Sequence, residues 1–358
     1  MSKVIDMKKY GLSDYFGQLS EGFDGLTVSR IMLQEKGLYR IISKYGEKLA
    51  EISGKFQYNI ATISDYPAVG DFVMVDWNEH GGNAVIHHVL PRKSCFTRKA
   101  AGDARQEQVV AANIDTVFLC MSLNNDFNLR RLERYLSIAW DSGATPVIVL
   151  TKSDLCDDLD SRVSEVSAIA IGVEVLVTNA FKETGYAKIC PFIMEGKTVA
   201  FIGSSGVGKS TLINCLLGKK HFSTNGLRND DKGRHTTTHR ELVLLPGGGM
   251  VIDTPGMREL GMWDNSTGIE QAFAEIEEIA ANCRFSDCTH SGEPGCAIRK
   301  ALENGSLPLE RWQSYQKLKA ESAYAEDSES YLAAKEQRFK DIAKKSKEIS
   351  KMRRFQNK

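Results

Sequence analysis

A glycine-rich segment in the middle of the chain has the composition of a phosphate-binding loop. With the residue that follows it, the segment reads Gly203-Ser204-Ser205-Gly206-Val207-Gly208-Lys209-Ser210-Thr211. Glycines let backbone N–H groups converge on phosphate oxygens, the lysine adds a positive charge, and the serine hydroxyl binds Mg²⁺. The apolar stretch 198–202 and the helical pattern 211–214 supply the strand and helix that such a loop needs. We therefore predict a nucleoside triphosphate site, rather than a glycine-rich turn without a ligand.

A second motif indicates which base is bound. It follows the apolar stretch 147–150 and reads Thr151-Lys152-Ser153-Asp154. The Asp154 carboxylate can accept hydrogen bonds from N1–H and the 2-amino group of guanine, whereas adenine offers neither donor and would leave the carboxylate unpaired. GTP is therefore favoured over ATP. The usual motif has asparagine where this chain has Thr151, which predicts weaker support of the phosphate loop but a retained site.

A third motif and a histidine complete the predicted catalytic site. The motif Asp253-Thr254-Pro255-Gly256 follows the strand pattern 250–252, so that Asp253 can reach Mg²⁺ through water and the Gly256 N–H can approach the γ-phosphate. Met257 comes next and cannot orient a water molecule. His235, in the segment 233–238, is the candidate for that role, with Thr237 or its neighbour Thr236 completing the Mg²⁺ shell. The alternative is that His235 is an ordinary exposed loop histidine.

The order of the three motifs is itself informative. An ordinary GTPase begins with the phosphate loop and reaches its guanine motif near the end of the domain. Here the guanine motif at 151–154 precedes the phosphate loop at 203–210, and the motif at 253–256 follows both. The sequence therefore predicts a circularly permuted GTPase domain, which the chain leaves directly after a nucleotide-sensing segment.

A cluster of cysteines and a histidine lies further along the chain. Its spacing is Cys-x4-Cys-x-His-x5-Cys, and its members are Cys283, Cys288, His290 and Cys296. Three thiolates and one imidazole form a closed tetrahedral set, which is typical of structural Zn²⁺ and leaves no open position for catalysis. Free buried thiols are the alternative. The other cysteines are scattered, which favours a reducing compartment over a disulfide framework.

The predicted secondary structure that must position these residues changes along the chain, from strands to alternating strands and helices and then to helices. Short alternating strand patterns separated by turns from about residue 25 to 90 predict a small β-barrel. Strands then alternate with helical stretches, as in a parallel sheet with crossover helices, and beyond about residue 262 helical patterns surround the cysteines. We expect a multidomain α/β protein: an N-terminal barrel of the oligonucleotide-binding (OB) type at 1–95, a circularly permuted phosphate-loop GTPase domain at 96–262, and a C-terminal helical zinc-binding domain at 263–358.

Composition narrows the possible partners. The 358 residues include 46 Lys+Arg and 46 Asp+Glu, so the chain has no overall basic coat but can carry local patches. Residues 335–358 hold ten Lys/Arg against three acidic residues, and Arg92, Lys93, Arg98 and Lys99 lie beside the barrel. Contact with RNA phosphates is the favoured interpretation and a solvated helical face is the alternative. The chain shows neither an apolar run of ~20 residues nor a signal-peptide core, which predicts a soluble cytoplasmic protein.

Together, the barrel, the permuted motif order and the Cys/His spacing resemble the ribosome small subunit-dependent GTPase A family. The resemblance covers about residues 25 to 318 and includes the segments 108–115, 132–136 and 233–238. It implies a late maturation factor of the small ribosomal subunit that binds the subunit's rRNA near the decoding region and whose slow GTP hydrolysis the subunit accelerates. It also implies that His235 is the catalytic histidine. Thr151 departs from the family's usual asparagine, which affects nucleotide affinity rather than identity. We expect a monomer that binds neither membranes nor DNA.

Two other functions fit parts of the sequence. One is a nucleotide-regulated RNA-binding assembly protein with little turnover; the intact Lys209, Ser210 and Asp253 argue against it, and measurable hydrolysis would decide. The other is a metabolic kinase that uses ATP at the phosphate loop. Asp154 and the motif at 253–256 argue against the kinase, and competition between nucleotides would decide.

Overall fold

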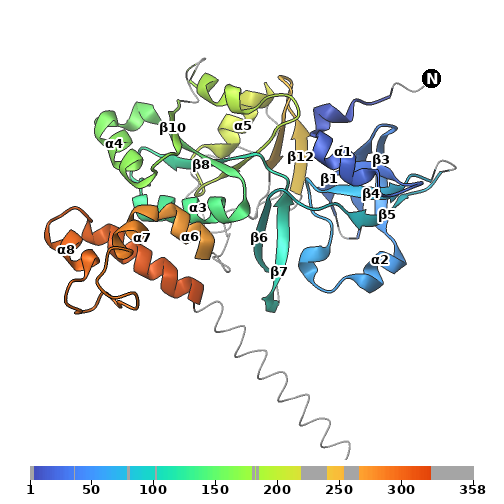
Figure 1. The fold of residues 1–358 in the computed structure, drawn as a ribbon. Coiled ribbons are helices and arrows are strands. Elements are labelled where there is room, and N and C mark those ends of the chain that lie inside the picture. The colour runs from blue at the N-terminus through green and yellow to red at the C-terminus, as the bar shows by residue number, and fades with distance from the viewer. Residues whose placement is uncertain are drawn as a thin grey trace, which may run out of the picture.

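The computed structural model describes residues 4–35, 37–78, 81–100, 103–179, 182, 185–218, 240–253 and 266–323. Figure 1 shows a β-barrel at one side of a sheet flanked by helices, with a helical C-terminal region, residues 266–323, at the other side. Two short helices, η1 (Met7–Tyr10) and α1 (Asp14–Ser20), precede the barrel. Within the described ranges, no helix combines the length and apolar character needed to cross a membrane.

The barrel is a closed ring of strands. The order around the ring is β1-β2-β3-β5-β4, and β4 pairs with β1 to close it. The strands are β1 (Thr27–Gln34), β2 (Tyr39–Ser43), β3 (Gly46–Ile52), β4 (Phe72–Asp76) and β5 (Ala84–Val89), and α2 (Gly54–Asn59) lies between β3 and β4 in the chain. Ile31, Ile41 and Val73 belong to one buried core because side chains alternate between the two faces of a strand. The predicted barrel is confirmed.

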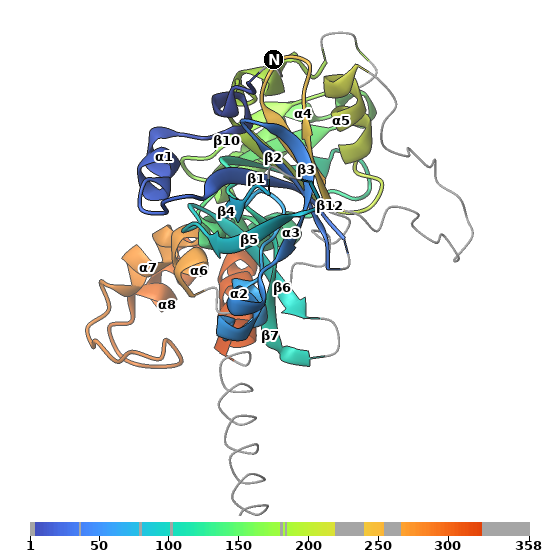
Figure 2. The same cartoon turned by 90° about the vertical axis from the view of Figure 1, so that its right-hand side faces the viewer.

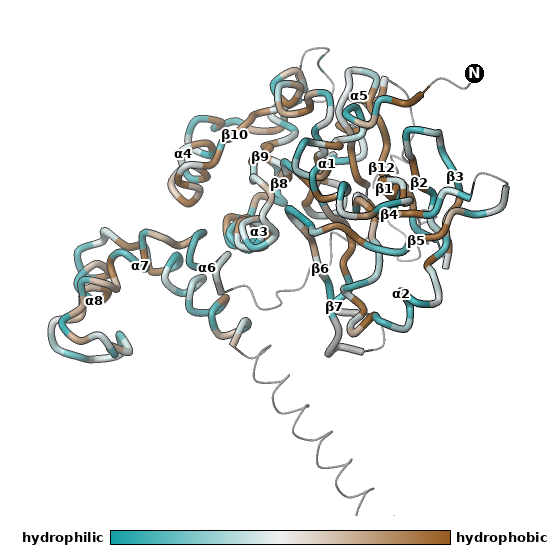
Figure 3. The backbone as a smooth tube through the Cα atoms, turned by 45° about the vertical axis from the view of Figure 1, so that its right-hand side comes forward, coloured by the Kyte–Doolittle hydropathy of each residue, from teal (hydrophilic) through white to brown (hydrophobic). Residues whose placement is uncertain are grey.

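The second sheet carries the nucleotide motifs. Its order is β10-β9-β8-β11-β13-β12, in which only β12 is antiparallel to its neighbour in this series. The strands are β8 (Thr116–Ser122), β9 (Thr145–Thr151), β10 (Glu174–Val177), β11 (Thr198–Ile202), β12 (Arg240–Leu244) and β13 (Met250–Asp253). Figure 3 shows hydrophobic residues along β10 and β12. The near-continuous burial of β8, β9 and β11 fits strands that are covered on both faces.

Helices cover both faces of this sheet. Leu119 and Ala200 point into a core shared with α3 (Leu129–Ser142), whereas their neighbours Phe118 and Phe201 point into a core shared with α5 (Lys209–Leu217). Other helical elements between the strands of this sheet are α4 (Leu159–Ile169), η3 (Ser153–Leu155) and η4 (Ala187–Phe192), and η2 (Ile63–Asp65) lies between α2 and β4 of the barrel. Because successive side chains of a strand point to opposite faces, one face of β8 and β11 packs against α3 and the other against α5.

Barrel and sheet are joined by a shared ladder and a buried arginine. β1 pairs with β12 through Leu33 and Glu241. Beside this junction Arg30 is 1% exposed, and its N–H groups donate to the carbonyl oxygens of Tyr10, Gly70 and Asn113, to Thr198 Oγ1 and to Met250 Sδ. Burial lowers the pKa of Arg30 to about 10, with Asp115 and Asp71 acting against it, so the guanidinium stays charged at neutral pH. These bonds tie barrel, N-terminal segment and sheet together.

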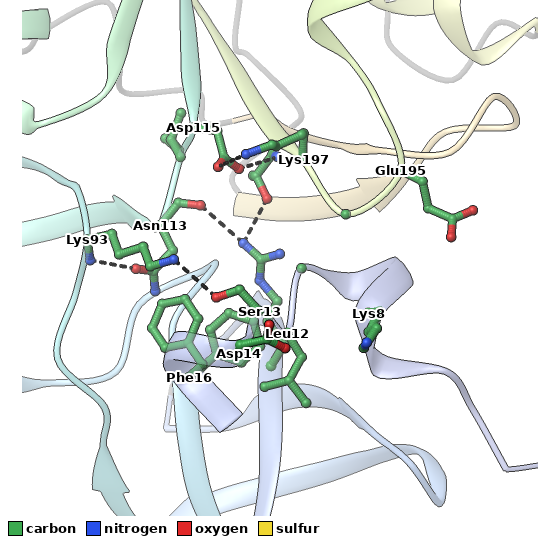
Figure 4. A pocket seen from close by; sticks show the side chains of 16 residues that line it. Lys8, Leu12, Ser13, Asp14, Phe16, Lys93, Asn113, Asp115, Glu195 and Lys197 are labelled. Atoms are coloured by element: carbon green, nitrogen blue, oxygen red, sulfur yellow. Dashed lines mark hydrogen bonds and ion pairs between the residues drawn. The ribbon is translucent and has the colours of Figure 1, made fainter. Parts of the chain in front are cut away.

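A cavity of about 340 Å³ lies beside Arg30 at the start of β11 (Figure 4). Lys93 reaches across it to Ser13 Oγ at 3.1 Å, and Lys197 pairs with Asp115 at 3.1 Å. The phosphate loop follows the other end of β11, so this cavity is separate from the predicted nucleotide site.

Two features near the barrel differ from expectation. A hairpin of β6 (Cys95–Ala100) and β7 (Asp103–Ala112) projects from the molecule near α2 (Figure 2). Arg92, which we expected in an RNA-contacting patch, instead makes two 2.8 Å bonds to the buried Asp71 and donates to two backbone carbonyls. That prediction was wrong because the Arg92 guanidinium is occupied by these contacts with Asp71 and the backbone.

The C-terminal region packs against α3. It contains α6 (Ser266–Ala272), α7 (Ala274–Ala280), α8 (Ala297–Glu303) and a helical stretch at 309–323, as the sequence predicted for this part. Phe273, Trp312 and Leu318 share a buried core with Leu132 of α3. Gly268 approaches α3 so closely that a Cβ would lie 2.1 Å from the Ser137 carbonyl oxygen. The region and the sheet domain therefore share one packed interface.

A buried ion pair crosses that interface. Glu133 of α3 is fully buried and accepts from Arg311 at 2.9 Å, while Arg311 also binds Glu275 and the Ala272 carbonyl oxygen. We expect Arg311→Met to destabilise the 309–323 stretch by about 3 kcal/mol, because the buried Glu133 carboxylate loses its buried cationic partner and keeps only the more exposed Arg130 and the Ser314 hydroxyl. Native-state hydrogen exchange of amides in 309–323 measures the loss.

The matched control is Arg299→Met, which removes an exposed pair with Glu303 at 3.3 Å. We expect a change of at most about 1 kcal/mol there. Equal effects of the two substitutions would contradict the assignment of the Glu133–Arg311 pair as a structural link.

Candidate nucleotide and metal sites

The phosphate loop lies where the strand order of the sheet reverses. From β8 the chain moves outward to β9 and β10, and it then returns to place β11 on the other side of β8. Ligands of open α/β sheets bind outside the carboxyl ends of the strands at such a reversal. The loop begins at Gly203, where a Cβ would lie 2.5 Å from the Cys120 carbonyl oxygen, so only glycine fits. Ser205 and Gly206 at the crest are exposed.

The loop ends on the first turn of α5, which begins at Lys209. Helix N-termini favour anions because their N–H groups are unpaired and the dipole is positive there. Lys209 Nζ donates to the carbonyl oxygens of Gly203 and Ser204 at 2.5 and 2.6 Å and so folds back over the loop. Ser210 and Thr211 are half-buried beside it. This arrangement suits a phosphate chain.

The guanine motif is brought against the phosphate loop. Thr151, at the end of β9, is 4% exposed, and its Oγ1 donates to the Val207 carbonyl oxygen at 2.6 Å. A Cβ on Gly208 would lie 4.0 Å from Thr151, so the two segments touch. Threonine therefore supplies a direct bond to the loop at the position where asparagine is usual.

The rest of the motif turns away from the strand at once. Lys152 adopts a left-handed conformation with φ 56°, and Ser153 and Asp154 begin the short helix η3. The Ser153 N–H donates to the Thr178 carbonyl oxygen at 3.4 Å, which holds this turn near the end of β10. The Asp154 carboxylate is exposed, as a base-reading group in an open site must be.

Several predicted site residues lie outside the described residues. These are His235, Thr237 and Gly256. Of Asp253 only the backbone is described, and it ends β13, next to β11. The end of β13 therefore lies at the same edge of the sheet as the phosphate loop.

The four predicted metal ligands converge in the C-terminal region. The ligand atoms of Cys283, Cys288, His290 and Cys296 all lie within 4.8 Å of one another. His290 Nδ1 lies 3.6 Å from Cys283 Sγ and 3.5 Å from Cys296 Sγ. Two ligands of a tetrahedral zinc, with bonds of ~2.3 Å to sulfur and ~2.05 Å to nitrogen, would be ~3.5 Å apart. The geometry therefore fits Zn²⁺.

The surroundings favour the thiolate at Cys283, whereas burial and the neighbouring sulfurs raise the pKa of Cys288 to about 11. Burial tends to raise the pKa of Cys283, but backbone N–H groups of Ala297 and Ile298 donate to its sulfur, and the pKa falls below its usual value. Cys296 caps α8 and accepts from the Arg299 N–H at 3.5 Å. The His290 ring packs edge-on against Trp312, with centroids 5.6 Å apart. The cluster thus connects two loops, α8 and the 309–323 stretch.

Comparison with known proteins shows the family of the chain. The sequence model of the RsgA GTPase family matches residues 89–263. A Lactiplantibacillus plantarum protein named Small ribosomal subunit biogenesis GTPase RsgA 2 is 48% identical over 323 residues, which cover 90% of each chain. An Opitutus terrae protein named Small ribosomal subunit biogenesis GTPase RsgA is 46% identical and covers 90% of this chain and 91% of its own. The chain belongs to the RsgA GTPase family.

Solved structures agree with the fold. YjeQ from Thermotoga maritima has a TM-score of 0.62 and 27% identity, and the match covers 82% of this chain and 97% of that one. YloQ, described as a circularly permuted GTPase, has a TM-score of 0.60 and 25% identity, covering 85% of this chain and 96% of its own. The circular permutation predicted from the motif order is confirmed.

Substitution of Thr151 directly tests its contact with the phosphate loop. We expect Thr151→Val to weaken GTP binding about 5- to 30-fold, because an isosteric side chain without the hydroxyl leaves the Val207 carbonyl oxygen unpaired. Thr151→Ser retains the hydroxyl and is the control, with affinity near that of the unsubstituted protein. Titration with a fluorescent GTP analogue measures both. Equal affinity of the valine and serine variants would contradict the loop-fastening role.

The metal cluster is tested by its ion content. We expect Cys288→Ser to remove nearly all bound zinc and to unfold the loops between Cys283 and Cys296, since metal binding and folding are linked in such small sites. Metal analysis of the purified protein and circular dichroism measure the two effects. Cys190→Ser, at an exposed cysteine outside the cluster, is the control. Undiminished zinc in the Cys288 variant would contradict the assignment.

Sequence reasoning missed one residue beside the nucleotide site. Asp126 follows β8 and accepts a hydrogen bond from Ser204 of the phosphate loop at 2.5 Å. The available signal was its place just beyond the carboxyl end of an apolar strand, next to the strand that bears the loop. No motif marks it, because the contact depends on strand order.

Proposed function

We propose that this chain hydrolyses GTP as a late maturation factor of the small ribosomal subunit, that the subunit stimulates hydrolysis, and that hydrolysis is coupled to release. The observation that carries the proposal is the direct contact of Thr151, in the guanine motif, with Val207 of the phosphate loop, in a member of the RsgA family. The relatives' names supply the subunit as partner. We expect the protein to act in the cytoplasm as a monomer.

Different residues of the chain would bind the base, the phosphates, Mg²⁺ and the attacking water. Asp154 would read guanine, while Lys209 and the loop N–H groups would neutralise the phosphates. Ser210, Asp253 and Thr237 would hold Mg²⁺, which supplies charge stabilisation at the β- and γ-phosphates when bound. His235 would orient the attacking water, since Met257 has no group that can do so.

The parts outside the GTPase domain would bind RNA. We assign residues 1–95 to the barrel, 96–262 to the GTPase domain and 263–358 to the zinc-binding domain with its basic tail. Barrels of the OB type bind nucleic acids on their strands and loops, and structural zinc would keep the C-terminal domain folded. The Lys/Arg of 335–358, a segment that lies outside the described residues, would contact rRNA phosphates.

In the GTP state, Thr237 and Gly256 would tether two loops to the γ-phosphate, and hydrolysis would release them. The second loop continues through 258–263 into the C-terminal region, so release would change the affinity for the subunit. The test is equilibrium binding of purified small subunits in the presence of GDP or a non-hydrolysable GTP analogue. We expect tighter binding with the analogue, and equal affinities would refute the switch.

A further inference from the structure

Asp126 lies between the phosphate loop and the first turn of α3. Its Oδ2 accepts from Ser204 Oγ at 2.5 Å, and its Oδ1 pairs with Arg131 Nη2 at 2.9 Å. Asn124 Oδ1 accepts from the Asp126 N–H at 3.1 Å and from the Ser122 hydroxyl at 2.8 Å, which fixes the turn after β8. One carboxylate thus joins a loop residue to a helix residue.

Arg131 is held in place mainly by this carboxylate. Its guanidinium also donates to the Asp126 carbonyl oxygen, whereas its buried Nε has no hydrogen-bond partner among the residues that the structure describes. A buried N–H without a partner is costly, so the surroundings other than Asp126 do not favour this position. The Arg131 backbone N–H is capped by Asn128 Oδ1 at 3.0 Å, which fixes the start of α3.

The charge of Asp126 does not suit direct phosphate binding. A carboxylate beside a phosphate loop repels a triphosphate, and Arg131 compensates for it only in part because both side chains are partly exposed. A direct attraction to the ligand therefore does not explain its position. A mechanical link between the phosphate loop and α3 explains the position of Asp126. When phosphates draw the loop N–H groups toward them, the Ser204–Asp126 hydrogen bond must shift with the loop.

α3 carries this link to the C-terminal region. Glu133 lies two residues beyond Arg131, about 3 Å along the helix axis. It is fully buried and binds Arg311 and Ser314 of the 309–323 stretch. Further along α3, Ser137 is in close contact with Gly268 of α6. A shift at the start of α3 is therefore transmitted to a packed, hydrogen-bonded interface.

We propose that Asp126 is a positioning residue that couples nucleotide occupancy of the phosphate loop to α3 and, through Glu133, to the C-terminal region. This route does not pass through residues 254–265. It rests on the proposed function, since it requires a nucleotide at the phosphate loop. Coupling between sites is reciprocal, so a partner that restrains the C-terminal region changes nucleotide affinity by the same factor.

The test is hydrogen exchange of the full-length protein with and without saturating GDP, in the unsubstituted chain and in D126A and D126N. In the unsubstituted protein we expect GDP to slow exchange in 203–210, and also in 129–142 and 309–323 by about 5-fold or more. D126A removes the acceptor for Ser204, so slowing persists in 203–210 but falls below about 2-fold in the two helices. D126N can keep both contacts, because its amide oxygen accepts from Arg131 while its amide N–H donates to the Ser204 hydroxyl, and it should restore the helix response.

The outcomes separate this inference from the proposed function. Asp160→Ala, at an exposed aspartate on α4, is the matched control and should respond as the unsubstituted protein does. Absence of any GDP effect in 203–210 of the unsubstituted protein would contradict nucleotide binding itself. A full helix response in D126A, or a lost one in D126N while 203–210 remains protected, would overturn the role of the Ser204–Asp126 bond and leave the GTPase assignment intact.

Discussion

Asp154→Asn is expected to weaken GTP binding by about 10²- to 10⁴-fold and to favour xanthosine triphosphate instead. The carboxylate of Asp154 accepts two hydrogen bonds from guanine, whereas an asparagine amide can accept one and must place a donor against the other. Xanthine has an oxygen where guanine has its 2-amino group, so the amide donor finds an acceptor. Competition of both triphosphates against a fluorescent GTP analogue measures the change.

A matched substitution lies in the same exposed turn. Asp157→Asn removes a neighbouring exposed carboxylate and should leave the preference for GTP unchanged. Retained GTP preference in the Asp154 variant would mean that the segment 151–154 does not read the base. The contact between Thr151 and the phosphate loop would then be purely structural.

His235→Ala is expected to lower subunit-stimulated GTP hydrolysis by about 10²- to 10⁴-fold, which is the range of a lost general base or water-orienting group. GTP affinity should remain within about 2-fold, because this side chain is proposed to contact the water and not the nucleotide. Single-turnover hydrolysis with saturating small subunits isolates the chemical step from product release. Nucleotide titration of the same variant measures the affinity.

His239→Ala is the control, since this second histidine lies in the same segment but outside the 233–238 motif. It should hydrolyse GTP at nearly the unsubstituted rate. Full stimulated hydrolysis in the His235 variant would exclude it as the water-orienting residue and would direct the search to a group that the subunit supplies.

The parts of the structure that were predictable are local in sequence. The phosphate loop, the strand before it and the Cys/His spacing each lie within about twenty residues, and their glycines and ligand types have few alternative uses. The barrel followed from strand patterns that alternate with turn residues. The permutation needed only the order of three motifs, and YloQ is described as having it.

The parts that were not predictable depend on contacts between distant segments. A charged residue such as Arg30 is expected at the surface of its strand, yet its hydrogen-bond partners lie in five other segments and its side chain is buried. The sequence predicts that Arg92 contacts nucleic acid, but in the structure Arg92 pairs with Asp71. Thr151 and Val207 are joined only because β9 and β11 both flank β8. Charge and side-chain type alone do not reveal such partners.

Stimulation of this chain by the small ribosomal subunit can be measured as GTP hydrolysis with and without purified small subunits, with ATP and with large subunits as controls. We expect slow hydrolysis of GTP by the protein alone, strong acceleration by small subunits, and no acceleration by large subunits or with ATP. Tight GTP binding without acceleration by the small subunit would contradict the assigned partner, and the GTPase fold would then need another one.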